Sequence, residues 1–224
     1  MAGVEKKSGR ALLFPEIKEI LEKRSIPAVR GAFVNDLSGA LKGAEGIGYP
    51  VVLKVVSRDV THKTDVGGVA LDLKSPEDLK SAWKGMLAAV RDKAPGADIS
   101  GFSIEKMVHP GLEVIVGALR DSQFGPVVMF GIGGIAVEIM KDVSFRLAPV
   151  TKKEALEMLK EVRLYPLLAG FRGSNPKDID ALSDVVMKFS EIIDEEKELE
   201  EIEINPLIVY EKGVVAVDSR AILL

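Results

Sequence analysis

The sequence predicts a mixed α/β fold in two lobes, an N-terminal lobe over residues 1–105 and a C-terminal lobe over residues 106–224. Helical and strand patterns alternate up to about residue 105. From residue 101 onward, short apolar strands follow one another between Gly, Pro or Asp turns, which predicts a mostly antiparallel sheet. The 224 residues are enough for two such lobes, and a cleft between lobes is a common place for a ligand.

In the N-terminal lobe, we expect a helix over 8–24, a strand over 27–34, a helix from Asp36 or Ser38 to Gly46–Gly48, the strand YPVVLKVV, the strand GGVALDLK and a helix from residue 75 to about 94. Ser75, Pro76, Glu77 and Asp78 are a strong helix start, with a capping hydroxyl, Pro at the first position and acids near the positive end of the helix dipole. The strand GGVALDLK is expected to alternate at positions 69, 71 and 73.

From residue 101 onward, the expected strands are FSIEKMV, LEVIVGAL, PVVMFGI, IAVEIMK and FRLAPV. Two helices, 151–161 and 176–193, come next. The charge run DEEKELEE predicts a solvated helix end. The chain closes with a hairpin that turns at residues 211–213.

The composition excludes several classes of protein. Formal net charge is −4 and there is no long basic run, so we expect no nucleic-acid partner. The absence of cysteine excludes disulfides and thiolate metal sites. We find no signal-peptide core and no apolar run near the ~20 residues that cross a bilayer. The prediction is a cytoplasmic protein without a membrane anchor.

Lys54 is unusual because it stands inside the apolar run of a buried strand. A buried lysine must find an anion or extend its ammonium to water. One interpretation is a structural pair with a carboxylate. The other is an ammonium directed at a phosphate, because the positive charge of lysine is compact and can pair with the negative charge spread over the phosphate oxygens.

The loop SRDVTHKTDVGGV, residues 57–69, gathers basic groups ahead of two glycines. Gly67 and Gly68 would let the backbone approach a ligand closely. The imidazole of His62 can attack phosphorus if a carboxylate orients its other nitrogen. Asp65 is either that carboxylate or a turn former. A histidine in a loop is also often inert, so both interpretations of His62 stay open.

Two further segments suit a nucleotide. FSIEKMV runs into Pro110 and Gly111 as an interlobe hinge, where backbone groups and apolar walls at Met107 and Val108 would suit an adenine. GIGGIAVEI, residues 131–139, is rich in glycine but lacks the spacing of a P-loop. It is either a phosphate loop or a tight turn between strands.

A last group of oxygen ligands lies in EIEINPL and VAVDSR. Glu203 and Asn205 alternate on one strand, so they point to one face of a sheet, and Asp218 lies on the facing strand. Such oxygens suit Mg²⁺, which completes its shell with phosphates and water. Arg220 is placed to touch a phosphate. The alternative is a polar strand face with no ligand.

Together these motifs resemble the β subunit of ADP-forming acetyl-CoA synthetases. The resemblance rests on LKVVSRDVTHKTDVGGV, on EKMV…GLEVIVGALRDSQFGPVVMFGIGGIAVEIMKDVSFRLAPV and on EINPL…VAVDSRAIL, and it covers nearly the whole chain. The chain departs from the family pattern at Arg58, where proline is frequent, and at Thr64, where serine is usual. Weaker similarity extends to the succinyl-CoA synthetase β subunit and to other ATP-grasp proteins.

The resemblance implies an ATP-grasp fold with a nucleotide cleft between the lobes and an acid–thiol ligase activity, acetate–CoA ligase of the ADP-forming kind. It implies that His62 carries a phosphoryl group, with Mg²⁺ and ADP or ATP bound nearby. It also implies a separate CoA-binding α subunit with its own phosphohistidine, in an α2β2 heterotetramer. For the nucleotide, the resemblance implies Lys54 on the phosphates, residues Glu105 to Val108 around adenine and Glu113 on a ribose hydroxyl. For Mg²⁺, it implies Asn205 and Asp218 as ligands, with Glu203 nearby.

Two rival functions remain open. A carboxylate ligase of the ATP-grasp kind makes an acyl phosphate directly from ATP and should survive the loss of His62. A non-catalytic regulatory subunit would bind ADP and never become phosphorylated.

Overall fold

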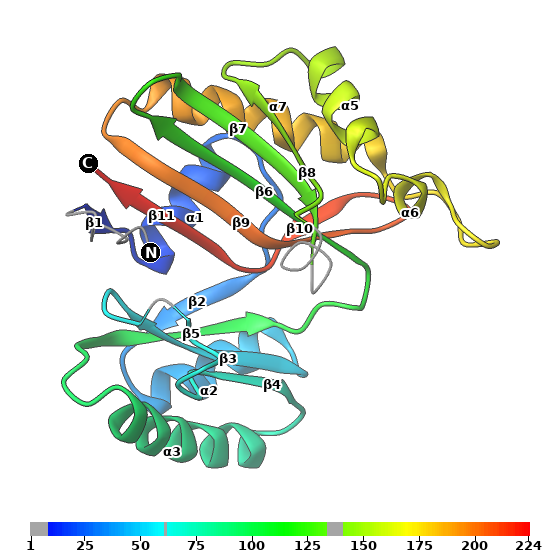
Figure 1. The fold of residues 1–224 in the computed structure, drawn as a ribbon. Helices are drawn as coiled ribbons and strands as arrows, with labels where there is room; N and C mark the ends of the chain where they lie inside the picture. The colour runs from blue at the N-terminus through cyan, green and yellow to red at the C-terminus, as the bar shows by residue number, and fades with distance from the viewer. Residues whose placement is uncertain (1–8, 61, 134–140) are drawn as a thin grey trace. The chain divides into compact units, whose positions relative to one another are not determined.

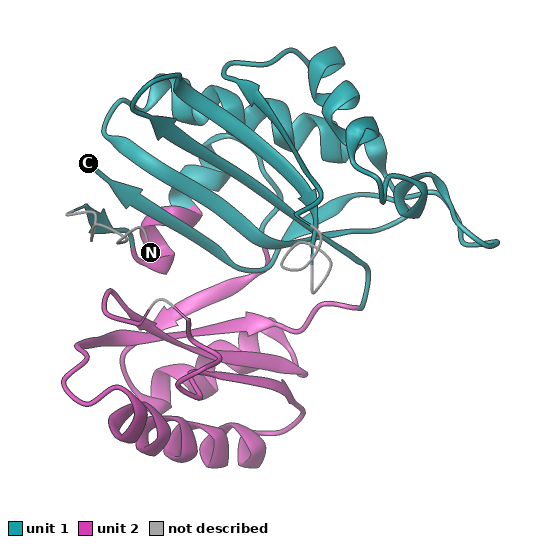
Figure 2. Cartoon of the chain, viewed as in Figure 1, with its two compact units in different colours: residues 1–12, 19–28, 110–224 teal, residues 13–18, 29–109 magenta. Residues whose placement is uncertain are grey.

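The computed structural model describes residues 9–60, 62–133 and 141–224, and the chain divides into two compact units (Figure 2). We call Leu13–Lys18 with Val29–His109 the N-terminal unit. The C-terminal unit comprises Met1–Leu12, Glu19–Ala28 and Pro110–Leu224. The change of unit after His109 lies close to the boundary expected after residue 105, but two early segments of the chain cluster with the C-terminal unit.

The N-terminal unit is built on a four-stranded antiparallel sheet in the order β2-β5-β3-β4 (Figure 1). Its strands are β2 (Gly31–Val34), β3 (Val51–Ser57), β4 (Val69–Leu73) and β5 (Ile99–Lys106). The expected grouping of the segment FSIEKMV with the strands that follow it is wrong. Most of this segment lies in β5, which pairs with β2 on one side and with β3 on the other. Both partner strands come earlier in the chain than β5.

Helices α2 (Leu37–Ile47) and α3 (Pro76–Lys93) share a hydrophobic core with this sheet. Both start as the sequence predicts, because Asp36 accepts the N–H of residue 39 and Ser75 accepts the N–H of residue 78. Trp83 of α3 packs on Phe102 of β5, with ring centroids 4.1 Å apart. The expected alternation of β4 fails at Leu71, which is exposed, because the pairing of β3 with β4 shifts register there.

The C-terminal unit holds a second sheet, whose main path is β1-β11-β9-β6-β7-β8, with β10 also paired to β9 (Figure 1). The strands are β1 (Arg10–Ala11), β6 (Leu112–Asp121), β7 (Gly125–Ile132), β8 (Val143–Leu147), β9 (Leu199–Val209), β10 (Val214–Ala216) and β11 (Ser219–Leu223). All of these pairs are antiparallel, as predicted. Most of the expected strand IAVEIMK lies outside the described residues.

Among the described residues, the remaining helices are α1 (Phe14–Lys23), α5 (Lys152–Glu161), α6 (Pro166–Ala169) and α7 (Ile179–Glu195). Helix α7 packs on β6, β7 and β9, and α5 packs on α7 and β8. The short helix α6 was not predicted, and α1 is preceded by a strand where we expected helix. None of the helices in the described residues is long and apolar enough to cross a membrane.

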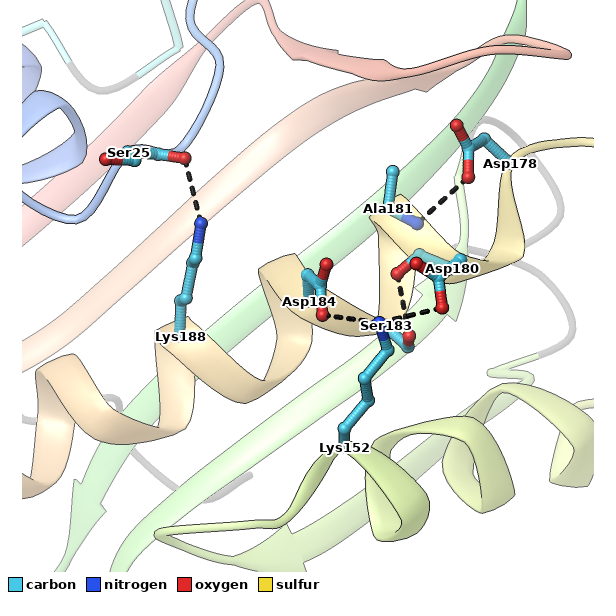
Figure 3. Close-up of polar contacts among 8 residues, drawn as sticks. All are labelled: Ser25, Lys152, Asp178, Asp180, Ala181, Ser183, Asp184 and Lys188. Carbon is cyan, nitrogen blue, oxygen red and sulfur yellow. Dashed lines mark hydrogen bonds and ion pairs between the residues drawn. The ribbon is translucent and has the colours of Figure 1, made fainter.

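Helix α7 starts at an aspartate cap rather than at residue 176 as expected (Figure 3). The Asp178 carboxylate accepts the N–H of Ala181 at 3.0 Å and that of Gly213 at 2.6 Å. These two backbone hydrogen bonds, first Ala181 and then Gly213, lower the pKa of Asp178. The cap therefore links the start of α7 to the turn between β9 and β10.

We expect Asp178→Ala to lower the free energy of unfolding by about 1–2 kcal/mol, because an N-cap and a second hydrogen bond are lost. Since the folded pKa lies below the unfolded one, this stabilisation is present above the unfolded pKa and disappears as pH falls through the folded pKa. Denaturant unfolding at pH 7 and at acid pH measures both effects. Asp180→Ala is the matched control, because the Asp180 carboxylate lies in the first turn of α7 and forms an exposed ion pair with Lys152 of α5 (Figure 3). An equal loss in both variants would contradict the role of the cap.

Candidate functional site

The predicted site residues form two groups, one in each unit. The N-terminal unit holds Lys54, His62, Asp65, Gly67, Gly68, Glu105, Met107 and Val108. The C-terminal unit holds Glu113, Glu203, Asn205, Asp218 and Arg220.

Lys54 lies in the middle of β3 and is buried, as the sequence predicts. Its Nζ atom lies 2.6 Å from Oε2 of Glu105 on β5, and only 2% of Glu105 is exposed. The other carboxylate oxygen, Oε1, accepts the hydroxyl of Ser103 at 2.6 Å. Lys54 therefore has the carboxylate partner that one of the two interpretations required, and both oxygens of Glu105 are engaged within the protein.

His62 and Asp65 are exposed in the loop that leaves β3. The N–H of Asp65 donates to the carbonyl of His62 at 3.2 Å, and Lys93 Nζ donates to the carbonyl of Asp65. Among the described residues of this loop, the link between His62 and Asp65 is a backbone turn and not a pair of imidazole and carboxylate. This arrangement agrees with the turn-forming interpretation of Asp65, and it leaves the imidazole of His62 at the surface.

The two glycines close the same loop. The N–H of Gly67 donates to the carbonyl of Thr64 at 3.1 Å, and that of Gly68 to the carbonyl of Lys63 at 2.7 Å. Gly67 has φ +71°, which favours glycine, and a Cβ on Gly68 would lie 2.5 Å from Val55 Cγ1. In this conformation both N–H groups close the turn, and the nucleotide contact expected of the two glycines stays a prediction.

The end of β5 carries the backbone groups expected beside an adenine. The N–H of Met107 donates to the carbonyl of Pro50 at 3.1 Å, and that of Lys106 to the carbonyl of Arg30 at 2.8 Å. Lys106 Nζ also contacts the carbonyls of Gly48 and Tyr49 at 2.8 and 3.0 Å. The N–H of Met107 is thus already engaged, and the expected contacts to a base rest on its carbonyl and on Val108.

The predicted magnesium ligands are neighbours in the C-terminal sheet. Glu203 and Asn205 lie on β9, and the N–H of Asn205 donates to the carbonyl of Asp218 at 2.9 Å. Arg220 on β11 is directly opposite Glu203. Among the described residues, no group of three His, Cys, Asp or Glu side chains is placed to hold a metal. Two carboxylates and one amide oxygen are nonetheless hard ligands of the number that suits Mg²⁺, which keeps water and phosphate in its shell.

Two remaining segments lie near the start of β6. Glu113 is exposed on this strand, opposite Ile208, and its carbonyl accepts the N–H of Gly133 at 2.7 Å. Of the segment GIGGIAVEI, Gly131 and Ile132 end β7, and Gly133 follows. The rest lies outside the described residues, so its two interpretations stay predictions.

Ser103 is a residue of this region that the motif analysis did not single out. Its hydroxyl is buried against the carboxylate of Glu105. The signal was present, because residues 103 and 105 alternate on one strand and so share a face. A small hydroxyl two positions from an acid in an apolar strand indicates such a pair.

Comparison with known proteins supports the resemblance. A family model described as an ATP-grasp domain matches residues 3–223. The chain is 48% identical to the acetate–CoA ligase (ADP-forming) I subunit beta of Pyrococcus furiosus, over 97% of this chain and 94% of the relative. It is 45% identical to acetate–CoA ligase (ADP-forming) I of Archaeoglobus fulgidus, where it covers 96% of this chain and 31% of the relative.

A solved structure agrees with these sequence matches. It is acetyl-coenzyme A synthetase 1 of Ca. Korarchaeum cryptofilum, in complex with coenzyme A and Mg-AMPPCP, with its phosphohistidine segment pointing towards the nucleotide-binding site. Its TM-score to this chain is 0.83 at 41% identity, and the match covers 96% of this chain and 93% of that one. The family model and the near-full-length identity therefore place this chain in the ATP-grasp family, among the β subunits of ADP-forming acetate–CoA ligases.

Proposed function

We propose that this chain is the nucleotide-binding subunit of an ADP-forming acyl-CoA synthetase and passes a phosphoryl group between His62 and ADP. The observation that carries the proposal is the placement of Lys54 on β3 and of His62 in the loop that follows this strand. One short segment provides the buried ammonium of Lys54 and, a few residues later, the exposed imidazole of His62. An ammonium suits the phosphates of a nucleotide, and an exposed imidazole can accept and release phosphorus.

In the proposed step, an oxygen of the terminal phosphate of ADP attacks the phosphorus on His62. The bond between phosphorus and the imidazole nitrogen breaks as the new P–O bond of ATP forms, and the imidazole keeps its electron pair. Lys54 stabilises the charge on the transferring group, because such reactions depend mainly on positioning and electrostatics. Backbone groups at Met107 and Val108 hold the adenine, and Glu113 holds the ribose.

Bound Mg²⁺ would neutralise phosphate charge next to Asp218, Asn205 and Glu203. These three residues belong to the C-terminal unit, and Lys54 belongs to the N-terminal unit. Arg220, opposite Glu203, adds a positive charge for the phosphates.

The proposed partner is a separate CoA-binding subunit, in an α2β2 assembly. The named β subunit of Pyrococcus matches this chain over nearly its full length, whereas the Archaeoglobus relative is a longer chain of which this region is about a third. The partner would form an acyl phosphate from acyl-CoA and phosphate, releasing CoA, and would transfer the phosphoryl group first to its own histidine and then to His62. The overall reaction is acyl-CoA with ADP and phosphate giving the free acid, CoA and ATP.

Calorimetric titration of the full chain with ADP tests the nucleotide site. We expect one site per chain, with affinity that falls about tenfold or more when EDTA removes Mg²⁺, because a bridging cation is lost. Asp218→Asn should reduce the difference between Mg²⁺ and EDTA. Asp184→Asn should leave it unchanged, because Asp184 lies on α7 and pairs with Lys152 of α5 (Figure 3). ADP affinity that ignores both Mg²⁺ and Asp218 would contradict the assignment of the metal.

A further inference from the structure

Lys54, Ser103 and Glu105 share one face of the sheet in the N-terminal unit. Lys54 and Ser103 are directly opposite each other on β3 and β5, so their side chains point the same way. Glu105 lies two residues beyond Ser103 and returns to the same face. The opposite face carries Leu53 and Ile104 into the core with α2 and α3. The polar group is therefore built into the sheet and separate from its hydrophobic core.

The three side chains are packed into one arrangement. All are at least nine-tenths buried, and Glu105 accepts from Lys54 on one oxygen and from Ser103 on the other, both at 2.6 Å. Gly31 lies behind the carboxylate, since a Cβ there would lie 2.8 Å from Glu105 Cγ. A buried ion pair costs desolvation and gives little net stability compared with apolar residues of the same size. Stability alone is therefore a weak explanation of this group.

We propose that Ser103 and Glu105 are positioning residues for Lys54. Ser103 fixes the rotamer of Glu105, and Glu105 is the counter-ion that holds the Lys54 ammonium in place within the sheet. When the nucleotide binds, its phosphates become partners of the Lys54 ammonium. This inference rests on the proposed function, and it assigns to Glu105 a role on the lysine instead of the contact with adenine that the family resemblance implies.

The two roles of Glu105 differ in the part of the ligand that they affect. A residue that acts through Lys54 changes the binding of phosphates and leaves the binding of the nucleoside unchanged. A residue that contacts adenine changes the binding of both. General damage to the fold also weakens both. Comparison of Mg-ADP with adenosine therefore separates the three explanations.

The experiment measures both ligands on the full chain by NMR titration, which also detects weak binding. We expect Ser103→Ala to weaken Mg-ADP binding about three- to tenfold, because one hydrogen bond to a charged group is lost. Glu105→Gln should weaken it about tenfold or more, because a buried ammonium loses its counter-charge. Adenosine affinity should stay within about twofold of the wild type in both variants, since no phosphate is involved.

Two controls accompany these variants. Ser103→Thr keeps the hydroxyl on a residue that suits a strand, and we expect it to restore Mg-ADP affinity. Ser190→Ala removes another buried serine hydroxyl, which accepts the N–H of Val150 in the C-terminal unit, and should leave both ligands unaffected.

Wild-type affinity for Mg-ADP in Ser103→Ala would overturn the inference even if Glu105→Gln failed to fold. Equal loss of adenosine and Mg-ADP binding in the variants would also overturn it, in favour of an adenine contact or of general damage. Failure of the wild-type chain to bind Mg-ADP at all would overturn the proposed function, and the inference with it.

Discussion

Replacing His62 by asparagine is expected to lower ATP formation, measured with the CoA-binding subunit present, by at least about a thousandfold, because the group that carries phosphorus is removed. Asparagine cannot form a phosphoramidate intermediate of this kind, yet it fits an exposed loop position. Since the His62 side chain is exposed, the variant should fold with unchanged stability. Mg-ADP affinity should also be unchanged, which would separate loss of chemistry from loss of binding.

The matched control is His109→Asn, at the other histidine of the chain. His109 is also exposed and lies in the same unit. We expect this variant to keep the wild-type rate. A His62→Asn enzyme with substantial activity would contradict the shuttle and favour the carboxylate ligase, which needs no phosphohistidine.

Replacing Lys54 by methionine is expected to weaken Mg-ADP binding about a hundredfold or more, because the ammonium that faces the phosphates is lost. The variant should also lose about 3–5 kcal/mol of unfolding free energy, since Glu105 is left buried without its partner. Titration of the nucleotide and denaturant unfolding measure the two effects independently.

The double variant Lys54→Met/Glu105→Leu separates structure from function. Replacing both members of a buried ion pair by apolar residues of similar size is often neutral for stability. We therefore expect most of the lost unfolding free energy to return, while Mg-ADP binding stays weak. Recovery of both properties in the double variant would show that the pair serves the fold alone.

Local signals in the sequence predicted the helices of both units well. Ser75 and its neighbours start α3 at the expected place, because a cap depends only on residues within one turn. Helix α5 begins with a capping box formed by Thr151 and Glu154, in the position expected for the first C-terminal helix. The exceptions are likewise informative, since α7 starts where Asp178 can reach both its own helix and Gly213, a contact that sequence spacing does not reveal.

Long-range pairing could not be predicted in the same way. Strand β5, which contains Glu105, belongs to the N-terminal sheet because it lies between β2 and β3, and these partners are distant in the sequence. The alternatives for Lys54 stayed open for the same reason, since its carboxylate partner is 51 residues away. Periodicity gives the face of each residue on its own strand, but the register between strands decides which side chains meet.

The hydrogen bonds of the loop after β3 could not be predicted from its residue types. Glycines before a strand suggested a backbone open to phosphate, yet the N–H groups of Gly67 and Gly68 close a turn. Asp65 likewise contacts His62 through the backbone. The residue types were informative about the loop, whereas the direction of each N–H depends on dihedral angles that composition does not determine.

The most direct test of the account is transfer of label from γ-³²P-ATP with Mg²⁺ to the full chain, in parallel with the His62→Asn variant. We expect an acid-labile, alkali-stable label that maps to His62, is absent from the variant and is removed by ADP. Absence of label from the wild-type chain, with the CoA-binding subunit present and Mg-ATP bound, would contradict the phosphoryl shuttle and leave a nucleotide-binding subunit or a carboxylate ligase in its place.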